Sequence, residues 1–332
     1  MDINEYLKKY ERIFEIRISE YSTKIAEKWG YLPYMIERYN ELFGNGLFDF
    51  LRSCEVPLPR SIRCNDLKID CEKLVNRLDE KGFKLEKIYW LKHGYKVISK
   101  PKSPTLGATI EYLLGFYHIQ GISSMIPPYL LEPKQGELIL DLAAAPGSKT
   151  TQLSQLMRNE GIVIAVEKNP KRIRSLISNI NRLGCKNVIV VLDDATGLKL
   201  GTSVDKILLD APCSGEGIIM FDRSRKTKTP ITKLRDFSSL QLKLLKNAYN
   251  LLKDDGLLVY STCSIAPEEN ELVVNYAIEE LGMEVVKVNW FPHENGIEEY
   301  FNIKFSPSVK NCSRMYPHIH GTEGFFICLL KK

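Results

Sequence analysis

Two segments of the chain place a cysteine where a strand is expected to end, and nucleophilic chemistry could use them. The first reads Asp210-Ala-Pro-Cys213 and the second Ser261-Thr-Cys263-Ser. If the two strands are neighbours, as sequential strands usually are, their ends lie about 4.8 Å apart and the two thiols lie together at the same edge of the sheet. A single cysteine is most often a small buried hydrophobic residue. Two at matched strand ends, one of them three residues after Asp210, indicate a reactive pair, with a structural disulfide as the alternative.

Acidic residues end other strands of the same pattern and could hold a nucleoside. Glu167 follows Asp141 by 26 residues, a position from which a carboxylate reaches the two hydroxyls of a ribose. Asp194, after Asp193, could accept a hydrogen bond from the exocyclic amine of an adenine. These acids favour a neutral or cationic nucleoside over a triphosphate, and S-adenosylmethionine fits that description. For Glu167 alone, capping of the helix that follows is the alternative.

The turn after Asp141 is built from small residues and could lie against such a ligand. It reads Leu-Ala-Ala-Ala-Pro-Gly147-Ser-Lys149. A run of this kind lets the backbone approach a ligand at the start of a helix. It is not a P-loop, because Ser148 separates Lys149 from Gly147, and it is not a G-x-G-x-x-G motif either. A bare turn would explain the glycine equally well.

A long basic segment follows Cys213. Residues 215–233 are too many for an ordinary connection between a strand and a helix, which takes about 2 to 6 residues. The segment could clamp a phosphate backbone, or it could be a solvated surface loop. Its candidate RNA-binding residues are Arg223, Arg225, Lys226 and Lys228, with Lys233 near its end.

Strands that alternate with helices from about residue 137 must position these groups. Their near-continuous Val, Ile and Leu runs are typical of parallel strands buried on both faces, where ligands bind beyond the carboxyl ends. We therefore expect an α/β fold with a doubly wound, mostly parallel sheet. Strands are predicted at 137–143, 162–167, 187–192, 205–212 and 257–263, and helices at about 148–157, 170–183, 234–252 and 267–281.

The N-terminal third has a different pattern. Apolar residues three and four positions apart predict one long amphipathic helix over 2–28 and a second helical stretch after Pro33. Residues 61–99 read as strand, helix, strand, turn and strand, most of a small ferredoxin-like unit. Residues 52–100 carry 12 basic and 7 acidic side chains, so a partner that bears phosphates would meet this unit first, with a solvated charged face as the alternative. We expect a smaller α+β RNA-binding domain over 1–104 and a second domain over 105–332.

Composition and cysteine spacing limit the class of protein. The chain has 332 residues with a net charge of +5, and no apolar run is long enough for a membrane span or a signal peptide. Its eight cysteines include no C-x-x-C pair, which predicts reduced thiols in a cytoplasmic protein. No metal site is expected, because the spacing of the C-terminal cysteines and histidines matches no common zinc pattern, and alternate positions on an edge strand explain His318 and His320.

Three motifs resemble those of a known family when they are taken together. DLAAAPGSKTTQL, LDAPCSGEG and VYSTCSIAPEENE, in this order and spacing, are similar to the motifs of the Sun (Fmu, Nop2-like) RNA cytosine-5 methyltransferases. The resemblance covers about residues 105–332, and the layout of the N-terminal third is similar to archaeal members that act on tRNA. It implies a class I methyltransferase fold, S-adenosyl-L-methionine as cofactor and RNA, tRNA in particular, as partner.

The resemblance also implies roles for single residues. Cys263 would supply the nucleophile, Cys213 would assist product release, and Asp210 would face both cofactor and target base. Glu167 stands where aspartate is common in the family, and either acid can accept two hydroxyls. The implied cofactor-binding residues are Ala143, Ala144, Ala145, Pro146, Gly147, Ser148, Lys149, Glu167, Arg172, Asp194 and Asp210.

The chemistry of cytosine explains why such groups are needed. C5 is a poor nucleophile, so a thiolate adds to C6 and makes C5 enamine-like. A carboxyl group near N3 stabilises the charge that this addition creates, which suits Asp210, and a second thiol can promote its reversal. The base must be flipped out or already unpaired. The alternatives are a non-catalytic RNA-binding assembly factor, an rRNA cytosine methyltransferase, and a methyltransferase for an exocyclic amine, which would want an Asn-Pro-Pro-aromatic strand end.

Overall fold

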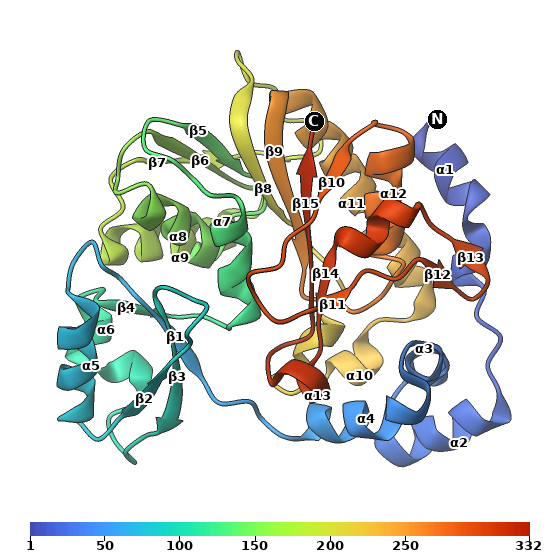
Figure 1. Ribbon diagram of the computed structural model, residues 1–332, viewed down its shortest axis with the longest axis horizontal. Helices are drawn as coiled ribbons and strands as arrows, with labels where there is room; N and C mark the ends of the chain where they lie inside the picture. Colours follow the sequence, from blue (N-terminus) through green and yellow to red (C-terminus); the bar gives the residue numbers. More distant parts are fainter. The chain divides into compact units, whose positions relative to one another are not determined.

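The computed structural model describes residues 1–332, which pack into two compact units (Figure 1). Unit 1 consists of residues 1–58, 211–250 and 260–332, and unit 2 of residues 59–210 and 251–259. These divisions of the chain are packing units and do not test the domain boundary expected at residue 104, which stays a prediction. No helix of either unit combines the length and the apolar character that a membrane span requires.

Unit 2 begins with a four-stranded antiparallel sheet in the order β2-β3-β1-β4, which is the ferredoxin-like arrangement expected from the sequence. Leu74 and Leu78 lie on one face of its first helix and pack against Ile62 and Tyr117 of the sheet. Asp70 caps that helix by accepting two backbone N–H bonds. The elements are β1 (Ser61–Cys64), α5 (Cys71–Asp79), β2 (Lys84–Lys87), β3 (Gly94–Ser99), η3 (Leu106–Ala108), α6 (Ile110–Leu113) and β4 (Tyr117–Ile119).

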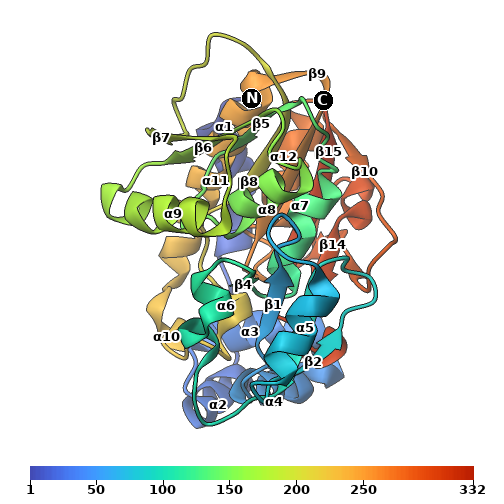
Figure 2. The same ribbon diagram turned by 90° about the vertical axis from the view of Figure 1, so that its left-hand side faces the viewer.

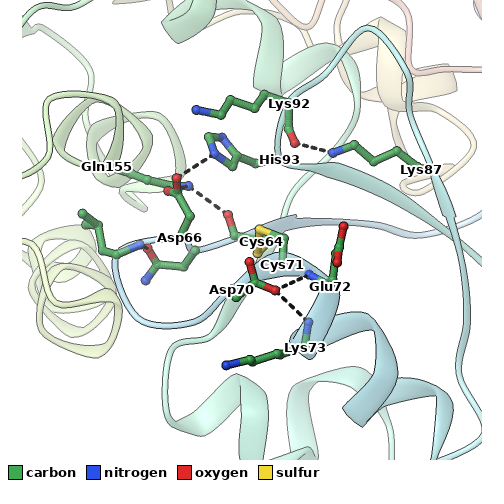
Figure 3. The surroundings of a disulfide bond; sticks show 12 residues. Cys64, Asp66, Asp70, Cys71, Glu72, Lys73, Lys87, Lys92, His93 and Gln155 are labelled. Atoms are coloured by element: carbon green, nitrogen blue, oxygen red, sulfur yellow. Dashed lines mark hydrogen bonds and ion pairs between the residues drawn. A yellow bond between two sulfur atoms is a disulfide. The ribbon is translucent and has the colours of Figure 1, made fainter.

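Four of the eight cysteines form disulfides, so the expectation of reduced thiols is wrong for them. Cys64 at the end of β1 is bonded to Cys71 at the start of α5, because the turn between them brings their Cα atoms to 5.9 Å (Figure 3). Cys312 is bonded in the same way to Cys328, with Cα atoms 4.5 Å apart. Neither spacing along the chain marks a disulfide, and only the fold brings the partners together. The free thiols are Cys54, Cys185, Cys213 and Cys263.

The rest of unit 2 contributes five strands, in the order β9-β8-β5-β6-β7, to a nine-stranded mixed sheet. The pairs β5–β6, β5–β8 and β6–β7 are parallel. Figure 2 shows α8 and α9 side by side along these strands, and α8 contacts β6 while α9 contacts β6 and β7. The elements are η4 (Ser123–Met125), α7 (Ile126–Leu130), β5 (Leu138–Asp141), α8 (Ser148–Leu156), β6 (Ile162–Glu167), α9 (Pro170–Leu183), β7 (Val188–Leu192), β8 (Val204–Asp210) and β9 (Leu252–Thr262), which continues into unit 1.

The strand order places a switch point at the carboxyl end of β5. Consecutive strands β6 and β7 continue the sheet on one side of β5, and β8 and β9 continue it on the other. In doubly wound sheets the connections diverge at such a point and leave room for a ligand. The turn that follows Asp141 begins there, so the fold directs this turn toward the place where a ligand would bind.

Unit 1 combines the N-terminal helices with two later segments of the chain. Its aromatic core includes Tyr39, Phe50 and Tyr316, with Phe43 packed against them. Its elements are α1 (Ile3–Lys9), η1 (Glu11–Phe14), α2 (Glu20–Trp29), α3 (Pro33–Phe43), η2 (Gly44–Gly46), α4 (Leu47–Glu55), η5 (Glu216–Ile218), α10 (Arg225–Lys228), α11 (Ile231–Leu251), α12 (Glu271–Glu279), β10 (Glu284–Val286), β11 (Glu294–Asn295), β12 (Glu299–Tyr300), β13 (Ile303–Lys304), η6 (Pro307–Asn311), β14 (Ser313–Met315), α13 (Pro317–His320) and β15 (Phe325–Lys331).

The prediction of one helix over 2–28 is wrong, because the chain breaks into α1, η1 and α2. Ser19 is the N-cap of α2, and its side chain accepts a hydrogen bond from the backbone N–H of Ser22. Glu37 of α3 holds Ser19 in place, since its Oε2 accepts the Ser19 N–H at 2.8 Å and the hydroxyl at 2.6 Å. Phe14 and Ile16 pack against the core of unit 1. Tertiary contacts thus override a helical period that the sequence does contain.

Two further expectations about unit 1 need correction. The basic segment 215–233 is not a plain loop, because η5 and α10 lie within it and α11 begins at Ile231. His318 and His320 lie on the short helix α13 instead of an edge strand, and Pro317 starts that helix. The ring of the half-buried His318 packs edge-on against Phe43, with centroids 4.9 Å apart.

Candidate active site

The turn between β5 and α8, here called the cradle, contains the residues of unit 2 that are predicted to contact the cofactor. Ala144 is buried against Ala165 of β6 and Leu176 of α9. Gly147 has a φ of +102°, and a Cβ there would lie 2.9 Å from Cδ1 of Leu176, so both the backbone conformation and the space require glycine. The small side chains let α9 pack closely against the turn. Residues 143–149, all predicted cofactor contacts, occupy this turn and the start of α8.

Glu167 and Arg172 lie beside the same turn. Glu167 is the last residue of β6 and is only 4% exposed. Its Oε1 accepts the N–H of Asn169 at 2.8 Å, and Nη1 of Arg172 lies 3.3 Å from its Oε2. Arg172 also donates through Nη2 to the carbonyl oxygen of Ala145. Arg172 therefore joins the end of β6 to the cradle, and the roles of both side chains toward a cofactor stay predictions.

The remaining acids at the strand ends have different surroundings. Asp141 is 1% exposed, and its Oδ2 accepts the hydroxyl hydrogen bond of Thr150 at 2.6 Å, so this carboxyl holds the start of α8. Burial raises the pKa of Asp141 to about 6. Asp194 is exposed, and the N–H and hydroxyl of Thr196, at 2.9 Å and 2.8 Å from its Oδ1, lower its pKa. Of these two carboxyls only Asp194 is accessible to an adenine.

Lys149 has a partner that the sequence did not reveal. Its Nζ lies 2.6 Å from Oδ2 of Asp210, and it also donates to Oγ of Ser124 at 3.0 Å. Lys149 stands in the first turn of α8 and Asp210 at the end of β8, a strand that pairs with β5. The cradle is thus tied directly to the strand end that carries the Asp-Ala-Pro-Cys motif.

The two predicted reactive cysteines meet in unit 1. Sγ of Cys213 lies 3.3 Å from Sγ of Cys263, and both are free thiols of intermediate exposure. The loop after Cys213 folds back over the second motif, because the N–H of Gly217 donates to the carbonyl oxygen of Cys263 at 2.9 Å. A Cβ at Gly217 would lie 1.9 Å from the carbonyl oxygen of Gly324, which excludes any side chain. The pairing expected from the two strand ends is present, without a disulfide.

The residues that follow Cys263 form a buried polar layer that sequence reasoning missed. Glu268, Glu269, Asn270 and Glu271 are all 0% exposed. Two of them form buried ion pairs: Glu268 pairs with Arg38 at 3.5 Å, and Glu271 with Arg314 at 2.5 Å. A run of acids at the start of a helix is normally a solvated cap, so no signal in the sequence marks this run as buried.

The four basic residues predicted to bind RNA divide into two kinds. Lys226 donates to Oε1 of Glu55 and, at 3.0 Å, to the carbonyl oxygen of Trp29, so it holds the fold of unit 1. Arg225 donates to the carbonyl oxygen of Ser214 at 2.8 Å, and its Nε lies 2.9 Å from Asp222. The exposed members of the set are Arg223, 3.6 Å from Glu55, and Lys228.

Two family models and several known proteins match this chain. The family model described as "16S rRNA methyltransferase RsmB/F" matches residues 128–331, and "N-terminal domain of 16S rRNA methyltransferase RsmF" matches residues 32–121. A tRNA (cytosine(49)-C(5))-methyltransferase of Pyrococcus abyssi is 39% identical over 300 residues, which cover 90% of this chain and 95% of that protein. The chain belongs to the RsmB/F family.

Other members of the RsmB/F family differ in length. A 28S rRNA (cytosine-C(5))-methyltransferase of Mus musculus is 37% identical over 322 residues, which cover 95% of this chain and 40% of that protein. The chain spans 40% to 52% of the eukaryotic rRNA relatives that it matches. The crystal structure of a methyltransferase homologue from Pyrococcus horikoshii has a TM-score of 0.86 at 38% identity and covers 95% of this chain and all of that one.

Membership of the RsmB/F family confirms the resemblance, the fold class and the cofactor class expected from the three motifs. The family consists of S-adenosylmethionine-dependent RNA methyltransferases. The residues of the cradle fit that cofactor chemically. Carboxylates end β6 and follow β7, where they suit ribose hydroxyls and an adenine amine, and the turn of small residues leaves its backbone open to close approach.

Proposed function

We propose that this chain transfers a methyl group from S-adenosyl-L-methionine to C5 of a cytosine in RNA, with tRNA as its substrate. The observation that carries the proposal is the pair of free thiols, Cys213 and Cys263, with sulfur atoms 3.3 Å apart. Each thiol lies within one of the two cysteine-containing motifs, LDAPCSGEG and VYSTCSIAPEENE. A non-catalytic assembly factor has no need for two reduced sulfur atoms in contact, and an exocyclic amine methyltransferase needs none.

The first chemical step belongs to Cys263. Its thiolate adds to C6 of the flipped cytosine, so that a carbon–sulfur bond forms and the C5–C6 double bond is lost. The π electrons shift toward C4 and N3, which leaves an enamine-like ring that is nucleophilic at C5. The charge that arises on the ring is stabilised by the carboxyl group of Asp210, hydrogen-bonded near N3. Asp210 and Cys213 are three residues apart, so their Cα atoms lie within roughly 11 Å of each other whatever the local conformation.

The second step restores the aromatic ring. The cofactor supplies the methyl group that becomes attached to C5. A base then removes the C5 proton, the C5–C6 double bond re-forms, and the bond between C6 and sulfur breaks to return Cys263 as a thiolate. Cys213 assists this release from its position beside the leaving sulfur. The second thiol therefore acts late, after the methyl group has been transferred.

The cofactor is held by the cradle of unit 2. Residues 143–149 would surround its methionine part, Glu167 would accept the ribose hydroxyls with Arg172 fixing its orientation, and Asp194 would accept from the adenine amine. The ion pair with Lys149 keeps Asp210 oriented at the same strand end. These positions follow from the family motifs together with the contacts between β6, α9 and the turn.

The choice of tRNA rests on one relative and on charge. The P. abyssi protein that is 39% identical to this chain is named for a tRNA cytosine. The ferredoxin-like sheet with its basic excess, together with Arg223 and Lys228, would contact phosphates. An rRNA cytosine is the second candidate, because the family model and the mouse relative are named for rRNA.

Two experiments test the proposal. Purified protein is incubated with labelled S-adenosylmethionine and either tRNA or rRNA transcripts, and 5-methylcytosine is located by bisulfite sequencing. We expect label in tRNA; label in rRNA alone would select the second candidate, and no label in either RNA would reject the activity. Calorimetry with S-adenosylhomocysteine tests the cradle: Asp194→Ala should weaken binding about tenfold, and Asp193→Ala much less. Equal affinity of both variants and the wild type would remove Asp194 from the site.

A further inference from the structure

The loops that carry the two thiols share one buried carboxylate. Each cysteine is followed by a serine, Ser214 after Cys213 and Ser264 after Cys263. Both hydroxyls donate to Oε2 of Glu269, at 2.5 Å from Ser214 and 2.6 Å from Ser264, and the two hydroxyl oxygens are 3.1 Å apart. A single oxygen atom thus joins the residues next to both sulfur atoms.

The other carboxylate oxygen strengthens the link to the first loop. Oε1 of Glu269 accepts the backbone N–H of Ser214 at 2.9 Å and the side-chain amide of Gln241 at 3.1 Å. The same amide of Gln241 donates to the carbonyl oxygen of Pro212 at 2.9 Å, on the other side of Cys213. The backbone of Glu269 is fixed in turn, because Tyr260 donates to its carbonyl oxygen at 2.6 Å. Residues on both sides of Cys213 are therefore held by one anchored group.

Burial makes this arrangement stiff. Glu269 is 0% exposed, so water cannot replace a lost hydrogen bond, and each donor that moves away leaves a buried acceptor without its partner. Burial also raises the pKa of Glu269 to about 7, and the hydrogen bonds from the two serines lower this pKa and so oppose the effect of burial. The two serines are consequently confined to positions that satisfy the same carboxyl group.

Neighbouring residues of the same acidic run do not connect the loops in this way. Glu268 pairs with Arg38, and Glu271 pairs with Arg314. Asn270 contacts only the second loop, since its side chain accepts from Thr262 at 2.6 Å and donates to the carbonyl oxygen of Ser264 at 3.0 Å. Glu269 alone in this run bonds residues that adjoin both cysteines.

We propose that Glu269 is a positioning residue that sets the separation between the Cys213 and Cys263 sulfur atoms through Ser214 and Ser264. The inference rests on the proposed function for what the two thiols do, but the geometry it describes exists without RNA or cofactor. Glu269 itself touches neither sulfur nor substrate in this role. Its effect on the reaction is to keep the releasing thiol beside the attacking one when the base is bound.

The first test measures the thiol separation without any activity. Wild type, Glu269→Gln, Ser214→Ala and Ser264→Ala are treated with diamide, which oxidises two thiols to a disulfide and is itself reduced to the hydrazine. Formation of the Cys213–Cys263 peptide is followed by mass spectrometry. We expect Glu269→Gln to slow this reaction about tenfold, because small displacements of reacting atoms have large effects. The serine variants should slow it less, and the double variant Ser264→Ala/Glu269→Gln no more than Glu269→Gln alone.

Ser154→Ala is the matched control. Ser154 is also a fully buried serine whose hydroxyl makes two side-chain hydrogen bonds, to Asn159 at 2.9 Å and Asn187 at 2.7 Å, and it contacts neither loop. This variant should lose stability as the serine variants do and yet cross-link at the wild-type rate. If it slows as much as Ser264→Ala, general loosening explains the result and the proposal is wrong.

The second test uses methylation kinetics. Glu269→Gln should lower kcat about tenfold while KM for RNA and for S-adenosylmethionine changes less than about twofold, because binding groups are untouched. Wild-type cross-linking and wild-type kcat in a folded Glu269→Gln would overturn the proposal. If Glu269→Gln does not fold, Ser264→Ala decides the matter by the same two measurements. Slowed cross-linking in a chain whose wild type never methylates RNA would reject the proposed function and leave the positioning role intact.

Discussion

Nζ of Lys149 lies 2.6 Å from Oδ2 of Asp210, and this ion pair joins the cradle turn to the strand that leads into Cys213. The two residues stand at the switch point of the parallel sheet, one at the start of α8 and the other at the end of β8. The Lys149 side chain is 10% exposed and that of Asp210 31% exposed, so the pair is partly shielded from water. A shielded pair of this kind fixes orientation more than an exposed one does.

Replacing Lys149 should therefore affect more than stability. Lys149→Met should weaken binding of S-adenosylhomocysteine about tenfold and reduce methylation strongly, because Asp210 loses its charged partner at the cradle. Lys253→Met is the control, since Lys253 forms an ion pair of the same 2.6 Å length with Asp205 but its side chain is 51% exposed. Calorimetry and initial rates measure both variants. Equal effects of the two would show that the Lys149 pair has no special role.

Loss of each thiol should have a different result. Cys263→Ala removes the attacking group, so methylation should disappear and no covalent complex should form. Cys213→Ala should still attack and methylate but release slowly, so a protein–RNA adduct should accumulate as a slower band on a denaturing gel. The double variant should show no adduct. An adduct with Cys263→Ala and none with Cys213→Ala would exchange the two roles; equal loss of activity without an adduct from either would indicate core residues.

The free energy of unfolding should depend on pH through the buried carboxyl group of Asp141. Its pKa is raised to about 6 by burial, first of all, and by the nearby Asp210. Between about pH 4 and pH 6 the folded protein therefore keeps a proton that the unfolded chain has released, and the free energy of unfolding falls as the pH rises through this range. Asp141→Asn should remove this part of the pH dependence, up to about 3 kcal/mol. Urea unfolding at a series of pH values measures it, and an unchanged slope would contradict the prediction.

The disulfide between Cys64 and Cys71 should stabilise the ferredoxin-like sheet. It closes a loop between residues seven positions apart, for which the chain-entropy model gives about 2.5 kcal/mol. The double variant Cys64→Ala/Cys71→Ala should lower the free energy of unfolding by about this amount. A reducing agent that breaks the Cys64–Cys71 bond should lower the Tm of the wild type, whereas this variant has no such bond to lose. Mass spectrometry without reduction checks that the bond forms. A wild-type Tm that is insensitive to reduction would show that it does not contribute.

RNA affinity should depend on salt and on the exposed basic residues only. Raising the salt concentration should weaken binding, because phosphate contacts release counterions. Arg223→Ala/Lys228→Ala should reduce both the affinity and its salt dependence. Lys226→Ala should instead lower the Tm, because Lys226 donates to Glu55 and to the Trp29 carbonyl oxygen. Filter binding at several salt concentrations distinguishes these outcomes, and equal affinity at low and high salt would exclude a phosphate-bound RNA.

Much of unit 2 and the thiol pair could be predicted from the chain alone. Strands β5 and β6 are apolar runs that end in an acid, and the importance of the residues at their carboxyl ends follows from a rule about parallel sheets. The expectation that Cys213 and Cys263 lie together needed only that two successive strands be neighbours. These features depend on local residue patterns or on the pairing of successive strands, which is why they can be predicted from the sequence.

Other features depend on partners that lie far away in the chain. The helical period of residues 2–28 is real, but Glu37 binds Ser19 and the helix is broken there. The acid Glu269 resembles a solvated helix cap until Ser214, Gln241 and Ser264 surround it. The sequence by itself determined the class of fold, the turn of small residues after Asp141 and the pairing of Cys213 with Cys263. Only the tertiary structure decided which charges are buried and which thiols are bonded, because the cost of burying a polar group depends on donors and acceptors that no local pattern specifies.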